Sequence, residues 1–81
     1  MAIRSRLKLL VAERNIERLK RGEPELTQRQ IAADCDLSLS VVNGLMSGRS
    51  VRVDFTTLDK ICAYFNVEPG DLLERVPERE G

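Results

Sequence analysis

The chain has 81 residues, 32% of them charged, with no His, two Cys and a formal net charge of zero. This length suits one small domain and is too short to hold a deep catalytic cleft as well as a hydrophobic core. No apolar run approaches the roughly 18 residues that cross a bilayer, and the N-terminal residues lack the small-residue cleavage site of a signal peptide. We therefore expect a soluble, cytoplasmic protein with no membrane partner.

The zero net charge is a sum over segments of opposite sign. Residues 1–22 hold seven basic and two acidic side chains, and residues 37–53 hold two basic and no acidic ones. Residues 23–36 and 54–81 are acidic. A balanced total lowers the expected non-specific affinity for nucleic acid without excluding binding, because the field depends on the face presented.

The first predicted helix covers residues 3–21. Ile3, Leu7, Leu10 and Val11 are expected to face the core, with Leu19 continuing the same apolar stripe. The sequence Gly22-Glu23-Pro24 then breaks the helix.

Residues 26–48 predict two short helices joined by a tight turn. Thr27 is an N-cap candidate for a helix that begins at Gln28, and Gln30 is placed to complete a capping box. Ile31, Ala32 and Cys35 form its apolar face. Asp36 falls where the turn needs a residue able to adopt a positive φ.

Ser38 is the N-cap candidate of the second short helix. Val42, Leu45 and Met46 recur at helical spacing and are expected to be buried, which leaves the opposite face exposed. That face carries Leu39, Ser40, Asn43 and Ser47. Two helices arranged in this way can place one of them in a DNA major groove.

Two more helices follow. Asp54 is expected to cap a helix whose inward stripe consists of Phe55, Leu58, Ile61, Cys62 and Phe65. Pro69 and Asp71 open a short fifth helix with Leu72 and Leu73 packed inward. We therefore expect an all-α, compact five-helix bundle formed by residues 1–76, with a polar tail at residues 77–81.

These segments resemble the phage repressor/Cro-like (XRE-type) helix-turn-helix family. The resemblance rests on Leu-Thr-Gln-Arg-Gln-Ile-Ala at 26–32, Leu-Ser-Leu-Ser-Val-Val-Asn-Gly-Leu at 37–45, Ser47-Gly48, Leu-Asp-Lys-Ile-Cys at 58–62 and the ending at 63–73. It covers roughly residues 3–75 and implies a lambda-repressor-like DNA-binding domain with the helix-turn-helix at helices 2 and 3. The chain departs from the family in having Asp36 in place of the usual turn Gly, and no Lys or Arg between Ser38 and Gly48.

The resemblance and the exposed face together give the candidate DNA contacts. Gln28 matches a family position that bonds phosphate, Asn43 has the amide that pairs with adenine, and Leu39 suits thymine methyl groups. Gly44 indicates a close approach, either to a DNA backbone or to a neighbouring helix. The candidate DNA-binding residues are Gln28, Arg29, Ser38, Leu39, Ser40, Asn43, Gly44, Ser47, Arg49, Ser50 and Arg52.

The leading hypothesis is a sequence-specific regulator of transcription that binds double-stranded DNA as a homodimer on an inverted repeat, and acts as a repressor. The alternative is a protein-interaction module, antitoxin-like or an adaptor, whose third helix grips another protein through Leu39 and Val41. No residue pattern for catalysis is present, so we expect no enzyme activity, no cofactor and no small-molecule ligand. Cys35 and Cys62 are expected to be reduced core residues rather than metal ligands.

Overall fold

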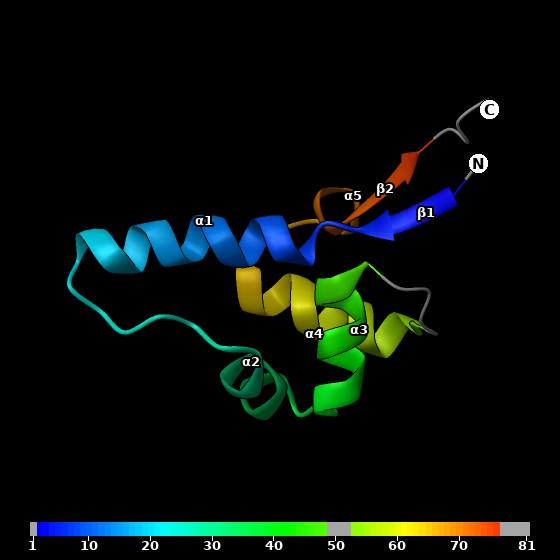
Figure 1. Cartoon of the computed structure of the whole chain (residues 1–81). Coiled ribbons are helices and arrows are strands. Elements are labelled where there is room, and N and C mark those ends of the chain that lie inside the picture. The colour runs from blue at the N-terminus through cyan, green and yellow to red at the C-terminus, as the bar shows by residue number, and fades with distance from the viewer. Residues whose placement is uncertain (1, 49–52, 77–81) are drawn as a thin grey trace.

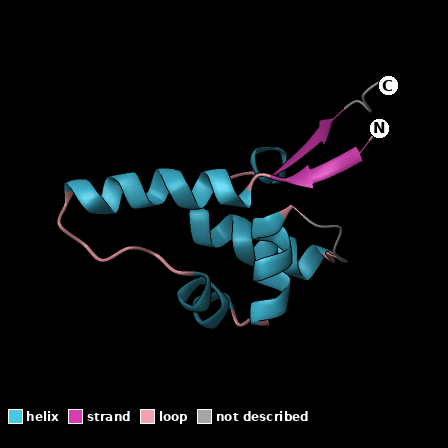
Figure 2. Cartoon of the chain, in the orientation of Figure 1, coloured by secondary structure: helices cyan, strands magenta, loops and turns pink. Residues whose placement is uncertain are grey.

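The computed structural model of the chain describes residues 2–48 and 53–76. Helices make up most of these residues, and two short strands form a small ribbon beside them (Figures 1 and 2). The elements are β1 (Ala2–Ser5), α1 (Leu7–Lys20), α2 (Gln28–Cys35), α3 (Leu39–Ser47), α4 (Phe55–Phe65), α5 (Pro69–Leu72) and β2 (Leu73–Val76). Five helices were expected, and all five are present.

The expectation of an all-α fold is wrong in one respect, because the two ends of the domain pair as an antiparallel ribbon. In the register of β1 and β2, Ile3 lies opposite Arg75 and Arg4 opposite Glu74. The backbone N–H of Arg6 donates to the carbonyl of Leu72 at 2.6 Å, which fixes the base of the ribbon. The pairing joins segments that lie about 70 residues apart, so no local periodicity indicates it.

The first helix consequently begins at Leu7 rather than at residue 3. The hydroxyl of Ser5 accepts a hydrogen bond from the backbone N–H of Leu7 at 3.0 Å. It thus pairs one of the backbone N–H groups that have no acceptor within the helix. Ile3 lies on the strand and is 64% exposed. The predicted inward position of Ile3 is therefore wrong.

The core draws one fully buried aliphatic side chain from each helix. These are Leu7, Ile31, Val42, Ile61 and Leu72, in chain order. Further buried side chains surround them: Val11, Leu26, Ala32, Cys35, Leu45, Cys62 and Phe65. Every helix is thus anchored to the same core, including the four-residue α5.

Two other apolar side chains do not follow their predicted placement. Phe55 is 87% exposed and Leu19 is 79% exposed, although both were expected on inward stripes. Leu73 packs against the core as expected, but it belongs to β2 rather than to the fifth helix. Phe55 is the first residue of α4, and Leu19 lies in the last turn of α1.

The predicted N-caps are confirmed. Thr27, Ser38 and Asp54 each accept a hydrogen bond from the backbone N–H three residues further on. Gln30 does not complete the predicted capping box, since its side chain donates to Asp34 at 2.7 Å instead. Asp34 also connects α2 to α4, because its other carboxylate oxygen accepts a hydrogen bond from the hydroxyl of Tyr64, also at 2.7 Å.

Burial affects three ionisable groups near this core. Desolvation raises the pKa of the Tyr64 hydroxyl to about 12, and its hydrogen bond to Asp34 acts in the same direction. Desolvation likewise raises the pKa of the Cys35 and Cys62 thiols above 9.0. Both cysteines are buried and unpaired, so they are protonated core residues at neutral pH.

The turn between α2 and α3 has the predicted left-handed residue. Asp36 adopts φ 55° and ψ 51°, and its carbonyl accepts a hydrogen bond from the Lys60 ammonium at 3.4 Å. The main-chain carbonyl of the turn is therefore hydrogen-bonded to a side chain of α4.

The strain at Asp36 gives a prediction about stability. We expect Asp36→Ala to unfold with a free energy about 1 kcal/mol lower than Asp36→Gly, because a Cβ atom disfavours the left-handed conformation. The Lys60 contact is made to a main-chain carbonyl, so neither substitution removes it directly. Urea unfolding of the two variants measures the difference, and equal midpoints and slopes would contradict the assignment.

Candidate nucleic-acid interface

The outward face of α3 carries the side chains that the sequence placed there. Ser40, Asn43 and Ser47 are exposed, and Leu39 is 43% exposed. Val42 and Leu45 are buried on the opposite side, and Met46 packs against the core. The helix is therefore amphipathic, as predicted. Its outward surface consists of polar side chains together with Leu39.

Val41 differs from the prediction that paired it with Leu39 as an exposed apolar residue. It is half-buried and packs against the core. Leu39 is thus the apolar side chain at the start of α3 that remains without a core contact. This narrows the apolar part of the candidate interface to one residue.

The N-terminus of α3 is held by Ser38. Its hydroxyl accepts a hydrogen bond from the backbone N–H of Val41 at 3.1 Å. The residue nevertheless remains exposed, so a second partner can approach the same hydroxyl. A helix N-terminus with exposed backbone N–H groups favours negative charge near it.

The start of α2 adds two further candidates. Arg29 is exposed and has no ion-pair partner within residues 2–48 and 53–76. Gln28 is half-buried at the first position of α2, next to the Thr27 cap. α2 packs against α3, so both candidate segments belong to the same packed pair of helices.

Gly44, the candidate for a close approach, is buried. The Ser47 hydroxyl donates to its carbonyl at 3.2 Å. Of the two neighbours that the sequence left open, DNA or the protein itself, burial favours the protein. The candidates Arg49, Ser50 and Arg52 lie outside the described residues.

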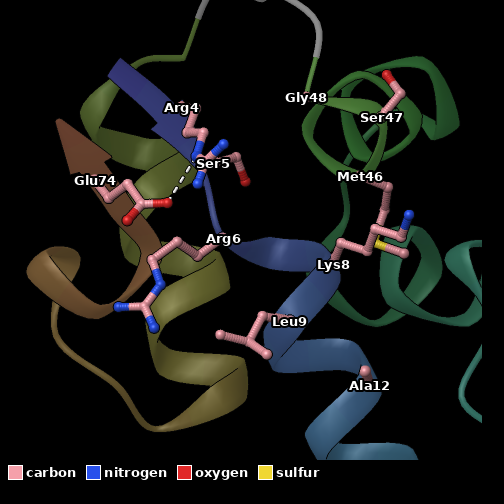
Figure 3. Close-up of a pocket in the computed structure, with 10 residues that line it drawn as sticks. All are labelled: Arg4, Ser5, Arg6, Lys8, Leu9, Ala12, Met46, Ser47, Gly48 and Glu74. Atoms are coloured by element: carbon pink, nitrogen blue, oxygen red, sulfur yellow. Dashed lines mark hydrogen bonds and ion pairs between the residues drawn. The ribbon is translucent and has the colours of Figure 1, made fainter. Parts of the chain in front are cut away.

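A cleft beside the end of α3 was not predicted. It has a volume of about 550 Å³ and lies between the start of α1, the ribbon and the last turn of α3 (Figure 3). Arg4, Arg6 and Lys8 make its rim basic, and Arg4 is bound to Glu74 at 2.7 Å. The signal in the sequence was the excess of basic residues before residue 22, but only the fold brings them next to Ser47 and Gly48.

The described residues lack other features that would suggest a different kind of site. They contain no group of three His, Cys, Asp or Glu side chains placed to hold a metal ion. None of the described helices is both long enough and apolar enough to cross a bilayer.

The arrangement is that of a small, mainly helical domain in which the outer face of α3 is exposed. A comparison with protein-family models matches residues 6–78 to the Cro/C1-type helix-turn-helix (HTH) DNA-binding domain. The chain therefore belongs to that family, as its motifs indicated. No curated protein and no solved structure matched the chain.

Proposed function

We propose that the protein is a sequence-specific transcriptional regulator that binds double-stranded DNA and acts as a repressor by occupying its site. The observation that carries the proposal is the exposed face of α3, a helix that the Ser38 cap holds at its start and that packs against α2. In this proposal α2 and α3 are the helix-turn-helix, and α3 enters the major groove. The function needs no catalysis, cofactor or small-molecule ligand and belongs to the cytoplasm.

The side chains divide into two roles. Asn43 and Ser40 read base edges, and Leu39 contacts a thymine methyl group. The side chains that contact phosphates and fix the orientation of the domain are Gln28, Arg29, Ser38, Arg49, Ser50 and Arg52. Ser47, at the end of α3, lies between the base-reading side chains and the phosphate-contacting ones. Because α3 carries no Lys or Arg, we expect sequence reading to rest on neutral hydrogen bonds rather than on an Arg–guanine pair.

We further propose that residues 1–76 form the single DNA-binding domain and that two copies bind an inverted repeat. Each α3 would then enter one of two successive major grooves about 34–36 Å apart. One module of this size buries little DNA surface, so a second copy supplies the affinity that a specific site requires. The polar residues 77–81 have no role in this proposal.

Ser38 offers a test that separates folding from binding. Ser38→Ala is expected to lower the free energy of unfolding by about 1 kcal/mol through loss of the cap. Ser38→Asp keeps an acceptor at the cap and adds a negative charge where a phosphate is proposed. We expect it to fold like the natural chain and to bind duplex DNA roughly tenfold more weakly at low salt.

The matched control for this test is Ser5→Asp, since Ser5 also accepts from a backbone N–H at a helix start. Fluorescence anisotropy with a labelled duplex measures the binding of both variants. Equal affinities for Ser38→Asp and Ser5→Asp would remove Ser38 from the interface.

A second candidate function follows from Leu39, an exposed apolar residue at the start of α3. A protein-interaction module of antitoxin or adaptor type would use this residue to grip a partner. The double variant Asn43→Ala, Arg49→Ala discriminates between the two functions. Loss of DNA binding with an intact fold supports the regulator, whereas unchanged binding removes both residues from the DNA interface.

A further inference from the structure

A second apolar stripe runs along α1 on the side opposite the core. Leu9, Ile16 and Leu19 are 44%, 55% and 79% exposed, and Ala12 is exposed between them. They follow one another at spacings of three, four and three residues, which places them on one face of a helix. Leu7 and Val11, the buried residues of α1, lie on the opposite face.

The stripe is exposed, but Leu9 and Ala12 also line the cleft beside Met46 and Ser47 of α3 (Figure 3). In Figure 1, α2, α3 and α4 all lie on one side of α1. The spacing of the stripe is that of positions a and d in a heptad, with Leu9 and Ile16 at a and Ala12 and Leu19 at d. A continuous exposed apolar face of this kind indicates a docking surface.

We infer that the occupant is a second copy of this chain, whose α1 lies parallel to the first and contacts it through the same stripe. The inference rests on the homodimer of the proposed function and assigns its contact surface. Such a contact is self-complementary about a two-fold axis, so each stripe contacts its own equivalent.

Charge complementarity selects both the second copy and the parallel direction. Lys8 precedes the stripe at position g and Glu13 follows at position e, so in a parallel pair Lys8 of each copy faces Glu13 of the other. An antiparallel pair that aligns Ala12 with Ile16 would instead bring the two Glu13 carboxylates together. Opposite charges at these positions favour a pairing, and like charges oppose it.

The segment after α1 adds a second complementary pair. Glu23 and Glu25 line a groove of about 260 Å³ beside Ile16 and Leu19. The connection is held against α1 by Asn15, whose side chain accepts from the backbone N–H of Leu26 at 2.6 Å. In the parallel pair, Lys20 of the other copy lies on this side of the seam, opposite Glu25, since Glu23 is paired with Arg21 of its own copy at 3.1 Å.

The contact is short, since fourteen residues of helix span about 21 Å. An interface of this length belongs to the weak, transient class. We therefore expect the dimer dissociation constant to be micromolar or higher in the absence of DNA. A DNA site with two half-sites should favour the dimer, because it holds the two copies side by side.

Cysteine cross-linking tests the arrangement. In a parallel pair, Ala12 of one copy faces Ala12 of the other, so Ala12→Cys is expected to form a disulfide-linked dimer under mild oxidation. The natural chain is the control, because its two thiols are buried. A cross-link that appears only when Ala12→Cys is mixed with Ile16→Cys would show the antiparallel pair, and no cross-link in either case would overturn the inference.

A charge swap tests the complementarity itself by sedimentation equilibrium. Lys8→Glu is expected to weaken the dimer several-fold, and adding Glu13→Lys to the same chain should restore it. If the double variant is as weak as the single one, Lys8 and Glu13 do not face each other.

A third variant separates this inference from the proposed function. Leu19→Glu places an unpaired charge on the seam and should raise the dimer dissociation constant more than about tenfold. Its binding to a duplex with one half-site should equal that of the natural chain. Loss of half-site binding in both proteins would instead mean that the DNA-binding proposal has failed, whatever the dimer does.

Discussion

Replacing Asn43 with Ala is expected to lower the affinity for the preferred duplex about 5- to 150-fold, the range that corresponds to a lost bidentate base contact of 1–3 kcal/mol. Asn43 is exposed on the outward face of α3, one turn before Ser47. The substitution leaves the buried side of the helix intact and replaces Asn with the best helix former. Folding should therefore be preserved while discrimination between duplexes is lost.

The measurement is the ratio of affinities for the preferred duplex and for a scrambled duplex, each by anisotropy at one salt concentration. The variant should change the first affinity strongly and the second little, because phosphate contacts remain. Asn66→Gly is a matched control, since it removes an exposed Asn from the end of α4 and keeps the left-handed conformation of φ 56°. A variant that weakens both duplexes equally would exclude base reading by Asn43.

Ile31→Ala is the substitution expected to cost the most stability. Ile31 of α2 is fully buried in the core, and removal of such a side chain costs about 2–5 kcal/mol. Small domains are stable by only about 5–15 kcal/mol. The variant should therefore unfold at a much lower urea concentration and lose DNA binding together with its fold.

The matched control is the same substitution at Ile16, which is 55% exposed on α1. Ile16→Ala is expected to change the free energy of unfolding by less than about 0.5 kcal/mol when measured at low micromolar concentration. Similar losses for both variants would contradict the division of α1 and α2 into core-facing and outward-facing residues.

Much of the helical part of the fold was predictable, because its signals are local. The Thr27, Ser38 and Asp54 caps each act on a residue three positions away, and a positive φ at Asp36 is required by the turn itself. The family match over residues 6–78 confirms the family resemblance. The contacts of individual residues with DNA remain predictions.

The missed features depend on contacts between distant segments. The ribbon needs β1 and β2 to meet, and nothing in Ala2–Ser5 indicates a strand until Leu73–Val76 lies beside it. Leu19 and Phe55 are exposed although helical spacing placed both on inward stripes. An apolar residue at helical spacing shows a face, but it does not show which face is covered by the same chain.

The most direct test of the central claim is a selection from a random pool of duplex DNA, carried out at roughly 50 and 200 mM salt. Phosphate contacts make the affinity fall steeply over this range, whereas base reading preserves the ranking of sites. A DNA-reading dimer predicts an enriched inverted repeat with half-sites about 10 base pairs apart at both salt concentrations. No enriched sequence at either concentration would contradict the proposed regulator and favour a protein partner for α3.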